Sequence, residues 1–331
     1  MTSGDYLPLI EKIRMRIASW TARMLSFAGR LQLISSVLFS LTNFWISAFR
    51  LPKACIKEID RLCSAFLWSG PSLNTKKAKV AWSEVCLPKS EGGLGLRSLE
   101  EANKRRRRHR FPLFVAIEEA IQKQQLSRSD DVYDIPLWKG KNDCYRKSFS
   151  TKDTWFHIHA THPQLPDYKA IWFTHATPKY AFLLWLVVKN RVATGDKLQQ
   201  WNPQAIASCI LCNHLQETTE HLFFQCSYSK LVWEGLIQKL LADNYTSHWR
   251  EVITLLTGNA LDKSQKFILG YAFQAAIHSL WRERNGRRHG ESSLTPEHLI
   301  KLIDKNVRNR LSTLPGGQDK LIQIWFAARF Y

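Results

Sequence analysis

The sequence predicts a mainly α-helical protein with two parts: an N-terminal helical bundle, and a second helical domain built around a cluster of metal-ligating side chains. Three observations predict this fold class. Apolar residues recur at helical spacing through most of the 331 residues, capping and stopping residues separate these runs, and four Cys and His residues lie in one short segment. A hydrophobic content of 45% is enough for packed cores.

Two helices are expected before residue 50. Residues 5–23 place apolar side chains on one stripe and basic side chains off it, which is typical of an amphipathic helix. Ser26 is expected to cap the next helix, which continues through the uncharged residues 31–49. Seven of those 19 residues are Gln, Ser, Thr or Asn, more than a lipid-facing span tolerates, so we expect a buried helix and no membrane insertion.

Two further helices and a basic run complete the N-terminal part, residues 1–125. Pro52 should open a helix that ends at Gly70, and Ser98 with Glu101 forms a capping box for the last helix. That helix leads into a basic run, which fits an exposed helix face, a nuclear-localisation signal or a phosphate-binding patch. The residues that we assign to nucleic-acid binding are Lys104, Arg105, Arg106, Arg107, Arg108 and Arg110.

The net charge of +19 favours a partner rich in phosphate, such as RNA or DNA, or an anionic membrane surface. The charge is unevenly distributed. Lys and Arg outnumber Asp and Glu by 21 to 10 in residues 1–125, by 13 to 11 in residues 126–249 and by 13 to 7 in residues 250–331. We therefore expect the N-terminal part to supply most of the electrostatic contact with nucleic acid.

A polar stretch, residues 126–148, is predicted to be a linker, and residues 149–245 are predicted to form the second domain. Pro178 should begin a helix that is apolar nearly all round and therefore lies at the centre of this domain. A short helix over residues 194–201 then brings the chain to the metal-ligating segment.

Cys209, Cys212, His221 and Cys226 offer three thiolates and one imidazole at a C-x2-C-x8-H-x4-C spacing. These donors suit Zn²⁺ in a closed structural site. His221 and Cys226 are five residues apart and do not share a face of one α-helix. We therefore place His221 on a short helical turn and Cys226 at its exit, near the N-terminus of the next helix, where the dipole favours a thiolate. His214 is a less suitable alternative ligand.

The C-terminal helical region, residues 246–331, is expected to contain two long helices. Asp262 should cap the first of them and Thr295 the second. Most aromatic residues fall on apolar stripes and are assigned to the core. Trp281 and Tyr228 are the two rings that we consider for base stacking, because they stand beside basic or metal-site residues.

No catalytic residue is predicted. The adjacent Asp130 and Asp131 lie in a polar stretch without the apolar strand that would present a polymerase carboxylate pair, and the glycine loop at residues 92–95 lacks the Gly-Lys-Ser/Thr of a phosphate-binding loop. Seven cysteines, four of them isolated, indicate a reducing compartment. The charged N-terminus is unlike a secretory signal.

Seven runs carry a family resemblance: WTARMLSFAGRLQLISSVLFSLTNFW, FLWSG, VAWSEVCLPKSEGGLGLRSLEEANK, PKYAFLLWLVVKNRVATGDKLQQW, CILC, EHLFFQC and WRERN. Together they resemble the C-terminal part of plant non-LTR (LINE-type) retrotransposon reverse transcriptases. The resemblance implies a thumb-like helical region followed by the reverse-transcriptase zinc-binding domain, with the four residues above at the family's Cys-Cys-His-Cys positions. Two departures stand out, since KRRRRHRFPLF replaces a longer hydrophobic helical segment and the polymerase palm is absent.

The sequence therefore predicts a non-catalytic fragment of a retrotransposon reverse transcriptase that binds structural Zn²⁺ and holds template RNA or target DNA. It predicts a nuclear protein, with a cytoplasmic stage during a retrotransposition cycle, and neither a membrane nor a small-molecule substrate as partner. Two alternatives stay open. The chain could be the truncated tail of an active RNA-directed DNA polymerase, or a domesticated module that binds other proteins.

Overall fold

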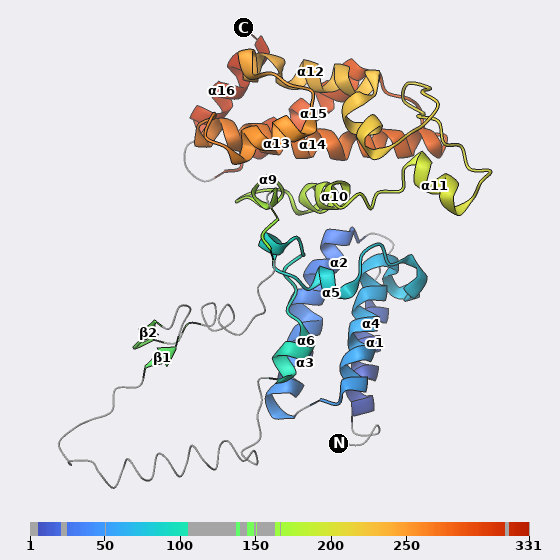
Figure 1. Ribbon diagram of the computed structural model, residues 1–331, viewed down its shortest axis with the longest axis vertical. Helices are drawn as coiled ribbons and strands as arrows, with labels where there is room; N and C mark the ends of the chain where they lie inside the picture. Colours follow the sequence, from blue (N-terminus) through green and yellow to red (C-terminus); the bar gives the residue numbers. More distant parts are fainter. Residues whose placement is uncertain are drawn as a thin grey trace, which may run out of the picture. The chain divides into compact units, whose positions relative to one another are not determined.

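The computed structural model describes residues 6–20, 25–49, 51–104, 137–139, 144–148, 150, 163–165, 167–314 and 318–330. Helices make up nearly all the regular structure in these ranges (Figure 1), so the predicted mainly α fold is confirmed. The chain divides into two compact units, Met1–Arg23 with Gln32–Gln164 and Met24–Leu31 with Leu165–Tyr331. Among the described helices, none combines the length and the apolar character that a membrane crossing requires.

The first unit is built from the helices α1 (Leu7–Ser19), α3 (Phe39–Ala48), α4 (Lys53–Ser69), α5 (Trp82–Val85) and α6 (Leu99–Lys104). A π-helical turn, Ile34–Leu38, joins α3 to α2 (Phe27–Leu33), which straddles the division between the units. The predicted caps are present: the Ser26 hydroxyl accepts a hydrogen bond from the backbone N–H of Gly29, and α4 ends at Gly70, whose φ of 69° favours glycine.

Helix α1 packs against α4 through its apolar stripe, whose members are Leu9, Ile10, Ile13 and Ile17. An exposed ion pair, 2.6 Å between Arg14 and Glu58, crosses the edge of this contact. Helix α6 is tied to the start of α4, because the buried amide of Asn103 bonds both the N–H and the C=O of Leu51 at 2.9 Å.

The predicted linker contains a short antiparallel hairpin, β1 (Trp138–Lys139) and β2 (Tyr145–Arg146), with Trp138 opposite Arg146. Strands of two residues are too short to show the alternation by which a strand is recognised in sequence. The hairpin was therefore not predicted.

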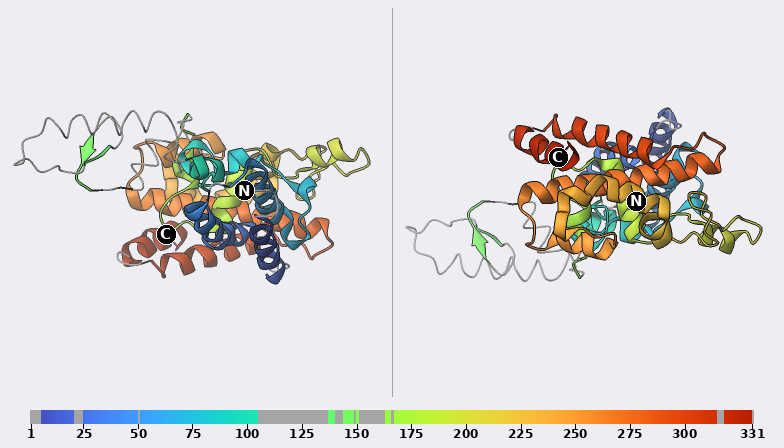
Figure 2. Two further views of the ribbon diagram at one scale, coloured as in Figure 1. Left: turned by 90° about the horizontal axis from the view of Figure 1, so that it is seen from below. Right: turned by 90° about the horizontal axis from the view of Figure 1, so that it is seen from above.

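The remaining described α-helices, among them the longest, α14, belong to the second unit. They are α9 (Tyr168–Ile171), α10 (Pro178–Val188), α11 (Gly195–Trp201), α12 (Ser227–Leu241), α13 (Trp249–Thr257), α14 (Lys263–Arg288), α15 (Pro296–Leu311) and α16 (Gln318–Phe330). Within this unit α10, α12, α13, α15 and α16 all pack on α14 (Figures 1 and 2). As predicted, α10 is buried from Tyr180 to Val187 and lies in the core.

The long helices begin where the sequence predicts. Asp262 forms a capping box with Gln265 at the start of α14, and the Thr295 hydroxyl caps α15. A Cβ at Gly235 of α12 would lie 2.5 Å from Cδ1 of Ile300 in α15, so a larger residue there would require the Ile300 side chain to shift.

Candidate metal centre

The four predicted ligand residues converge on one point in the second unit. Their ligand atoms, the three Sγ atoms and a ring nitrogen of His221, all lie within 4.8 Å of one another. The Sγ atoms of Cys209 and Cys226 are 3.9 Å apart, and Sγ of Cys212 is 3.2 Å from Nε2 of His221. Ligands of one tetrahedral Zn²⁺ lie roughly 3.3–3.8 Å from each other, as follows from Zn–S and Zn–N bond lengths. The donor set therefore fits Zn²⁺ in chemistry, and the two measured separations of 3.9 Å and 3.2 Å lie close to the required range.

A π-helical turn explains how His221 and Cys226 meet although they are five residues apart. The turn runs over His221–Gln225, and the N–H of Cys226 bonds the C=O of His221 at 2.7 Å. This i to i+5 bond is the mark of a π turn, and it brings both ends of the turn to one side. Thr218 starts the turn, because its hydroxyl accepts the N–H of His221 at 3.0 Å. The predicted placement of His221 on a helical turn and of Cys226 at its exit is confirmed.

The surroundings favour the metal-binding protonation state of Cys226 and His221, while the hydrogen bond to Cys226, followed by burial, raises the pKa of Cys209. A hydrogen bond from the Cys209 thiol is the main influence that lowers the pKa of Cys226, and the N–H of Ser229 in the first turn of α12 adds to it. Burial, helped by the neighbouring His214, lowers the pKa of His221 and keeps its imidazole neutral. Cys209, Cys226 and His221 are buried, so the centre is closed from most sides.

His214 is not part of the cluster. Its ring stacks on that of His221 with centroids 4.5 Å apart, and its Nδ1 faces the backbone of Gln216. The segment around it is held by its own backbone bonds, since the N–H of Cys209 donates to the C=O of His214 at 2.9 Å. His214 thus covers one side of the imidazole ligand.

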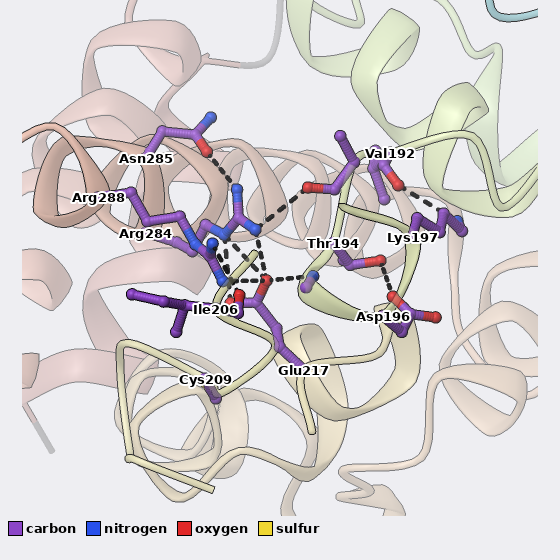
Figure 3. A network of polar contacts seen from close by, with 12 residues as sticks. Val192, Thr194, Asp196, Lys197, Ile206, Cys209, Glu217, Arg284, Asn285 and Arg288 are labelled. Carbon is purple, nitrogen blue, oxygen red and sulfur yellow. Dashed lines mark hydrogen bonds and ion pairs between the residues drawn. The ribbon is translucent and has the colours of Figure 1, made fainter. Parts of the chain in front are cut away.

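A buried ion pair ties the metal loop to α14 (Figure 3). Glu217 lies between the second and third ligands in sequence and is fully buried. Its carboxylate accepts bonds from Nε and Nη2 of Arg284, the latter at 2.5 Å, and from Nη2 of Arg288 at 3.4 Å. Arg284 also donates to the C=O of Ala193, and Arg288 donates to the C=O of Ile206 and of Ser208. Two arginines of one helix therefore hold both sides of the loop.

The same carboxylate anchors the start of α11. Glu217 accepts the N–H of Gly195 at 2.9 Å, and its own C=O accepts the N–H of Asp196 (Figure 3). Only glycine fits at position 195, because a Cβ there would stand 2.4 Å from the C=O oxygen of Ala207. Glu217 is thus the common point of α11, the metal loop and α14.

Sequence reasoning missed this ion pair. Glu217 reads as one of several polar residues in a loop, and Arg284 as one of several basic residues near a helix end. The signals were present, since WRERN was recognised as a family run and Glu217 falls inside the ligand segment. The pairing spans 67 residues, however, and no periodicity reports it.

The predicted nucleic-acid residues fall at the edge of the described structure. Lys104 is the last residue of α6, while Arg105, Arg106, Arg107, Arg108 and Arg110 lie outside the described residues, as do Asp130 and Asp131. Tyr228 is buried, with its hydroxyl on the C=O of Leu294 and the Arg287 guanidinium 4.7 Å above its ring. Trp281 lies under Arg284 at 4.9 Å. Tyr228 is therefore packed inside the fold, which does not support base stacking, whereas Trp281 is partly exposed and its base-stacking role stays a prediction.

Comparison with known proteins places the cluster in a recognised context. Residues 149–233 match a family described as zinc-binding in reverse transcriptase. A stretch of 96 residues is 38% identical to a putative ribonuclease H protein of Arabidopsis thaliana. That match covers 29% of this chain and 16% of the relative, so the chain spans a small part of the relative's length. No solved structure matches. All four cluster residues lie inside the segment that resembles the reverse-transcriptase zinc-binding family.

Proposed function

We propose that the chain is a non-catalytic, zinc-binding and nucleic-acid-binding fragment of a non-LTR retrotransposon reverse transcriptase. Cys209, Cys212, His221 and Cys226 would hold one structural Zn²⁺, and the basic N-terminal part would hold RNA or DNA in the nucleus. The observation that carries the proposal is the convergence of these four ligand atoms inside a segment that matches a reverse-transcriptase zinc-binding family.

The zinc in this proposal has a structural role. The donor set of three sulfurs and one nitrogen fills a tetrahedral coordination sphere and leaves no open position for a substrate or a water molecule. The bound ion would join the turn at Cys209 to the start of α12, in addition to the Glu217 network that ties the metal loop to α14. The residues around it position and close the site, and no group in it is assigned to a reaction.

Metal analysis of the purified chain tests the zinc-binding part of the proposal. We expect one zinc per chain, bound stoichiometrically and removed by a strong chelator together with the order of the second unit. Cys144→Ser is the matched control, because Cys144 is exposed and outside the cluster. A wild-type chain that is fully folded and free of metal would overturn the zinc assignment.

Nucleic-acid binding is supported by the charge of +19 and by its concentration in residues 1–125. We expect the full chain to bind short RNA and DNA with an affinity whose logarithm falls linearly with the logarithm of salt concentration. Fluorescence anisotropy across a salt series measures the affinity and its dependence on salt concentration. Absence of binding at low salt, or binding that salt does not weaken, would contradict this half of the proposal.

The predicted basic run is tested by charge-matched variants. Changing Arg105, Arg106, Arg107 and Arg108 to Gln should reduce the salt slope by about 2–4, at roughly 0.7–0.9 per lost phosphate contact. The control changes the same number of exposed lysines in the first unit, Lys53, Lys57, Lys76 and Lys77, to Gln. Equal losses in both variants would mean that the run is an ordinary solvated surface.

We further propose the domain limits 1–125, 126–148, 149–245 and 246–331. Limited proteolysis should cut first within 126–148. The name of the Arabidopsis relative refers to ribonuclease H, and we propose no such activity here, since the chain matches 16% of that protein. An assay of RNA cleavage in RNA–DNA hybrids checks this statement. It would be overturned if the wild-type chain cleaved RNA and a variant of the chain that lacks one carboxylate did not.

A further inference from the structure

A pocket of about 540 Å³ lies in the second unit, away from the metal cluster. Residues of α10, α14 and α15 line it, together with the segment that joins α14 to α15. We call it the α14 pocket. Tyr180, Leu299 and Leu302 contribute apolar surface to it, and Leu302 is 47% exposed.

Three cations from three different helices line the α14 pocket: Lys179 of α10, Arg282 of α14 and Lys305 of α15. All three side chains are exposed. Within the described part of the chain, none of them forms an ion pair with a carboxylate. Like charges gathered at one hollow repel each other, so an anion bound between them would be stabilised.

The acidic groups at the pocket do not cancel this charge. Glu283 and Glu291 also line it. Glu283 is already neutralised, because it accepts Nε of Arg287 at 2.7 Å and the N–H of Leu294 at 2.8 Å. Glu291 alone is left to oppose the three cations, and the pocket is therefore net positive.

A half-buried histidine lies beside these cations. His278 lines the same pocket, and its ring is tilted by 48° against that of Tyr180 with centroids 4.7 Å apart. Burial, followed by the charges of Lys179 and Arg282, lowers the pKa of His278 to about 4. The imidazole is therefore neutral at pH 7 and serves as a hydrogen-bonding group beside the cations.

The arginines of α14 differ in their bonding. Arg284, Arg287 and Arg288 all donate to carboxylates or carbonyls of the protein. Arg282 has no such partner among the described residues and faces the α14 pocket. The fold accounts for three of the four guanidinium groups, while the fourth is available for a ligand. A planar guanidinium with two flanking ammonium groups is suited to phosphate.

We propose that the α14 pocket binds the sugar–phosphate backbone of RNA or DNA through Lys179, Arg282 and Lys305. This inference rests on the proposed nucleic-acid binding and adds a second contact region, outside the basic run at residues 104–110. Contacts of this kind position a strand without reading its sequence. The exposed Leu302 beside the cations offers apolar surface to a sugar or base edge.

The test compares two triple variants of the full chain. The pocket variant carries Lys179→Gln, Arg282→Gln and Lys305→Gln. The control carries Lys239→Gln, Lys263→Gln and Lys320→Gln, which removes the same charge from exposed positions of this unit that do not line the pocket. We expect the salt slope for RNA or DNA to fall by about 2–3 in the pocket variant and by less than about 1 in the control. Circular dichroism and zinc content should match wild type in both.

The possible outcomes separate the two proposals. If wild type binds nucleic acid and both variants weaken it equally, the pocket is not a site, while the proposed function stands. If wild type binds no nucleic acid, the proposed function fails. Inorganic phosphate and pyrophosphate are then added to wild type and the pocket variant, with thermal stabilisation as the readout. Stabilisation lost in the pocket variant would assign the pocket to a free phosphate compound and overturn the nucleic-acid backbone as its ligand; no stabilisation would overturn the site.

Discussion

Each unit of the molecule contains a set of three cysteines with the same pattern of burial, yet the chemistry of the two sets differs; the exposed Cys144 of the first unit stands apart from them. In each set two thiols are buried and the third is partly exposed. The first set is Cys55, Cys63 and Cys86, and the second is Cys209, Cys226 and Cys212. Burial raises the pKa of Cys55 to about 11 and that of Cys86 to about 12, and it also raises the pKa of Cys63. In the second set the pKa of Cys226 is lowered.

The difference lies in what surrounds each thiol. In the first unit Asp60 is the neighbouring charge for both Cys63 and Cys86, and a negative charge favours the protonated thiol. In the second unit the neighbours are another thiol, backbone N–H groups and a neutral imidazole. Burial therefore favours the protonated thiol in the first set, whereas in the second set the hydrogen bond between two thiols favours the thiolate of Cys226 and raises the pKa of its partner Cys209.

The largest expected effect comes from exchanging one thiol in each set. Cys209→Ser should abolish zinc binding and disorder the metal loop, because it removes one of the four ligands and a closed structural site contributes folding free energy. Cys63→Ser should leave the zinc content unchanged and cost about 1–2 kcal/mol for a buried hydroxyl. Metal content and hydrogen exchange, resolved for each unit, measure both results. Full zinc occupancy in Cys209→Ser would remove the distinction between the two sets.

A second contrast concerns carboxylates. Glu217 and Arg284 have side chains that are 0% and 4% exposed, whereas Glu58 is 28% exposed and pairs with the still more exposed Arg14 and Arg61. Glu217→Gln should cost about 3–5 kcal/mol, because it leaves a buried guanidinium without its counter-charge. Glu58→Gln should cost less than about 1 kcal/mol, because solvent screens an exposed pair.

Chemical denaturation followed by a probe in each unit measures these costs. The double variant Glu217→Gln with Arg284→Met should recover part of the loss, since it removes the unpaired charge along with its partner. Equal costs for Glu217→Gln and Glu58→Gln would show that the Glu217 site is more hydrated than its burial indicates.

Sequence reasoning succeeded where the information is local. Caps at Ser26, Asp262 and Thr295 were predicted because a capping side chain bonds backbone groups two or three residues away. The buried α10 was predicted from its continuous apolar run. The four ligand residues were identified from spacing, and the structure brings them together, while their occupation by zinc stays a prediction.

The remaining features depend on contacts between distant segments. Sequence shows that His221 and Cys226 do not align on an α-helix, but the π turn that solves the problem forms in the context of Thr218 and α12. Glu217 and Arg284 are 67 positions apart in the sequence. The residues that line the α14 pocket come from three different helices. Neither leaves a periodic trace in the sequence.

The smallest expected effect concerns the partly buried carboxyl group of Asp60 in the first unit. Burial raises the pKa of Asp60 to about 6, from an ordinary value of 3.8. The folded state therefore holds this proton more tightly than the unfolded state does, and the stability that Asp60 contributes is full below about pH 4 and is lost as the pH rises through 6. Asp60→Asn should remove this dependence and stabilise the first unit at pH 7 by about 1–2 kcal/mol, after allowance for the part of the side chain that stays exposed.

Unfolding of Asp60→Asn and wild type at pH 4, 5.5 and 7, followed in the first unit, measures this effect. The two proteins should differ least at pH 4 and most at pH 7, because the wild-type carboxyl is protonated in the first case and charged in the second. The stability of the second unit should not change between the two proteins. The pKa values of its thiols Cys209 and Cys226 are set mainly by the hydrogen bond between them and not by a carboxylate. A difference that is constant across the three pH values would mean that the Asp60 carboxylate is solvated, and that burial alone accounts for the raised thiol pKa values around it.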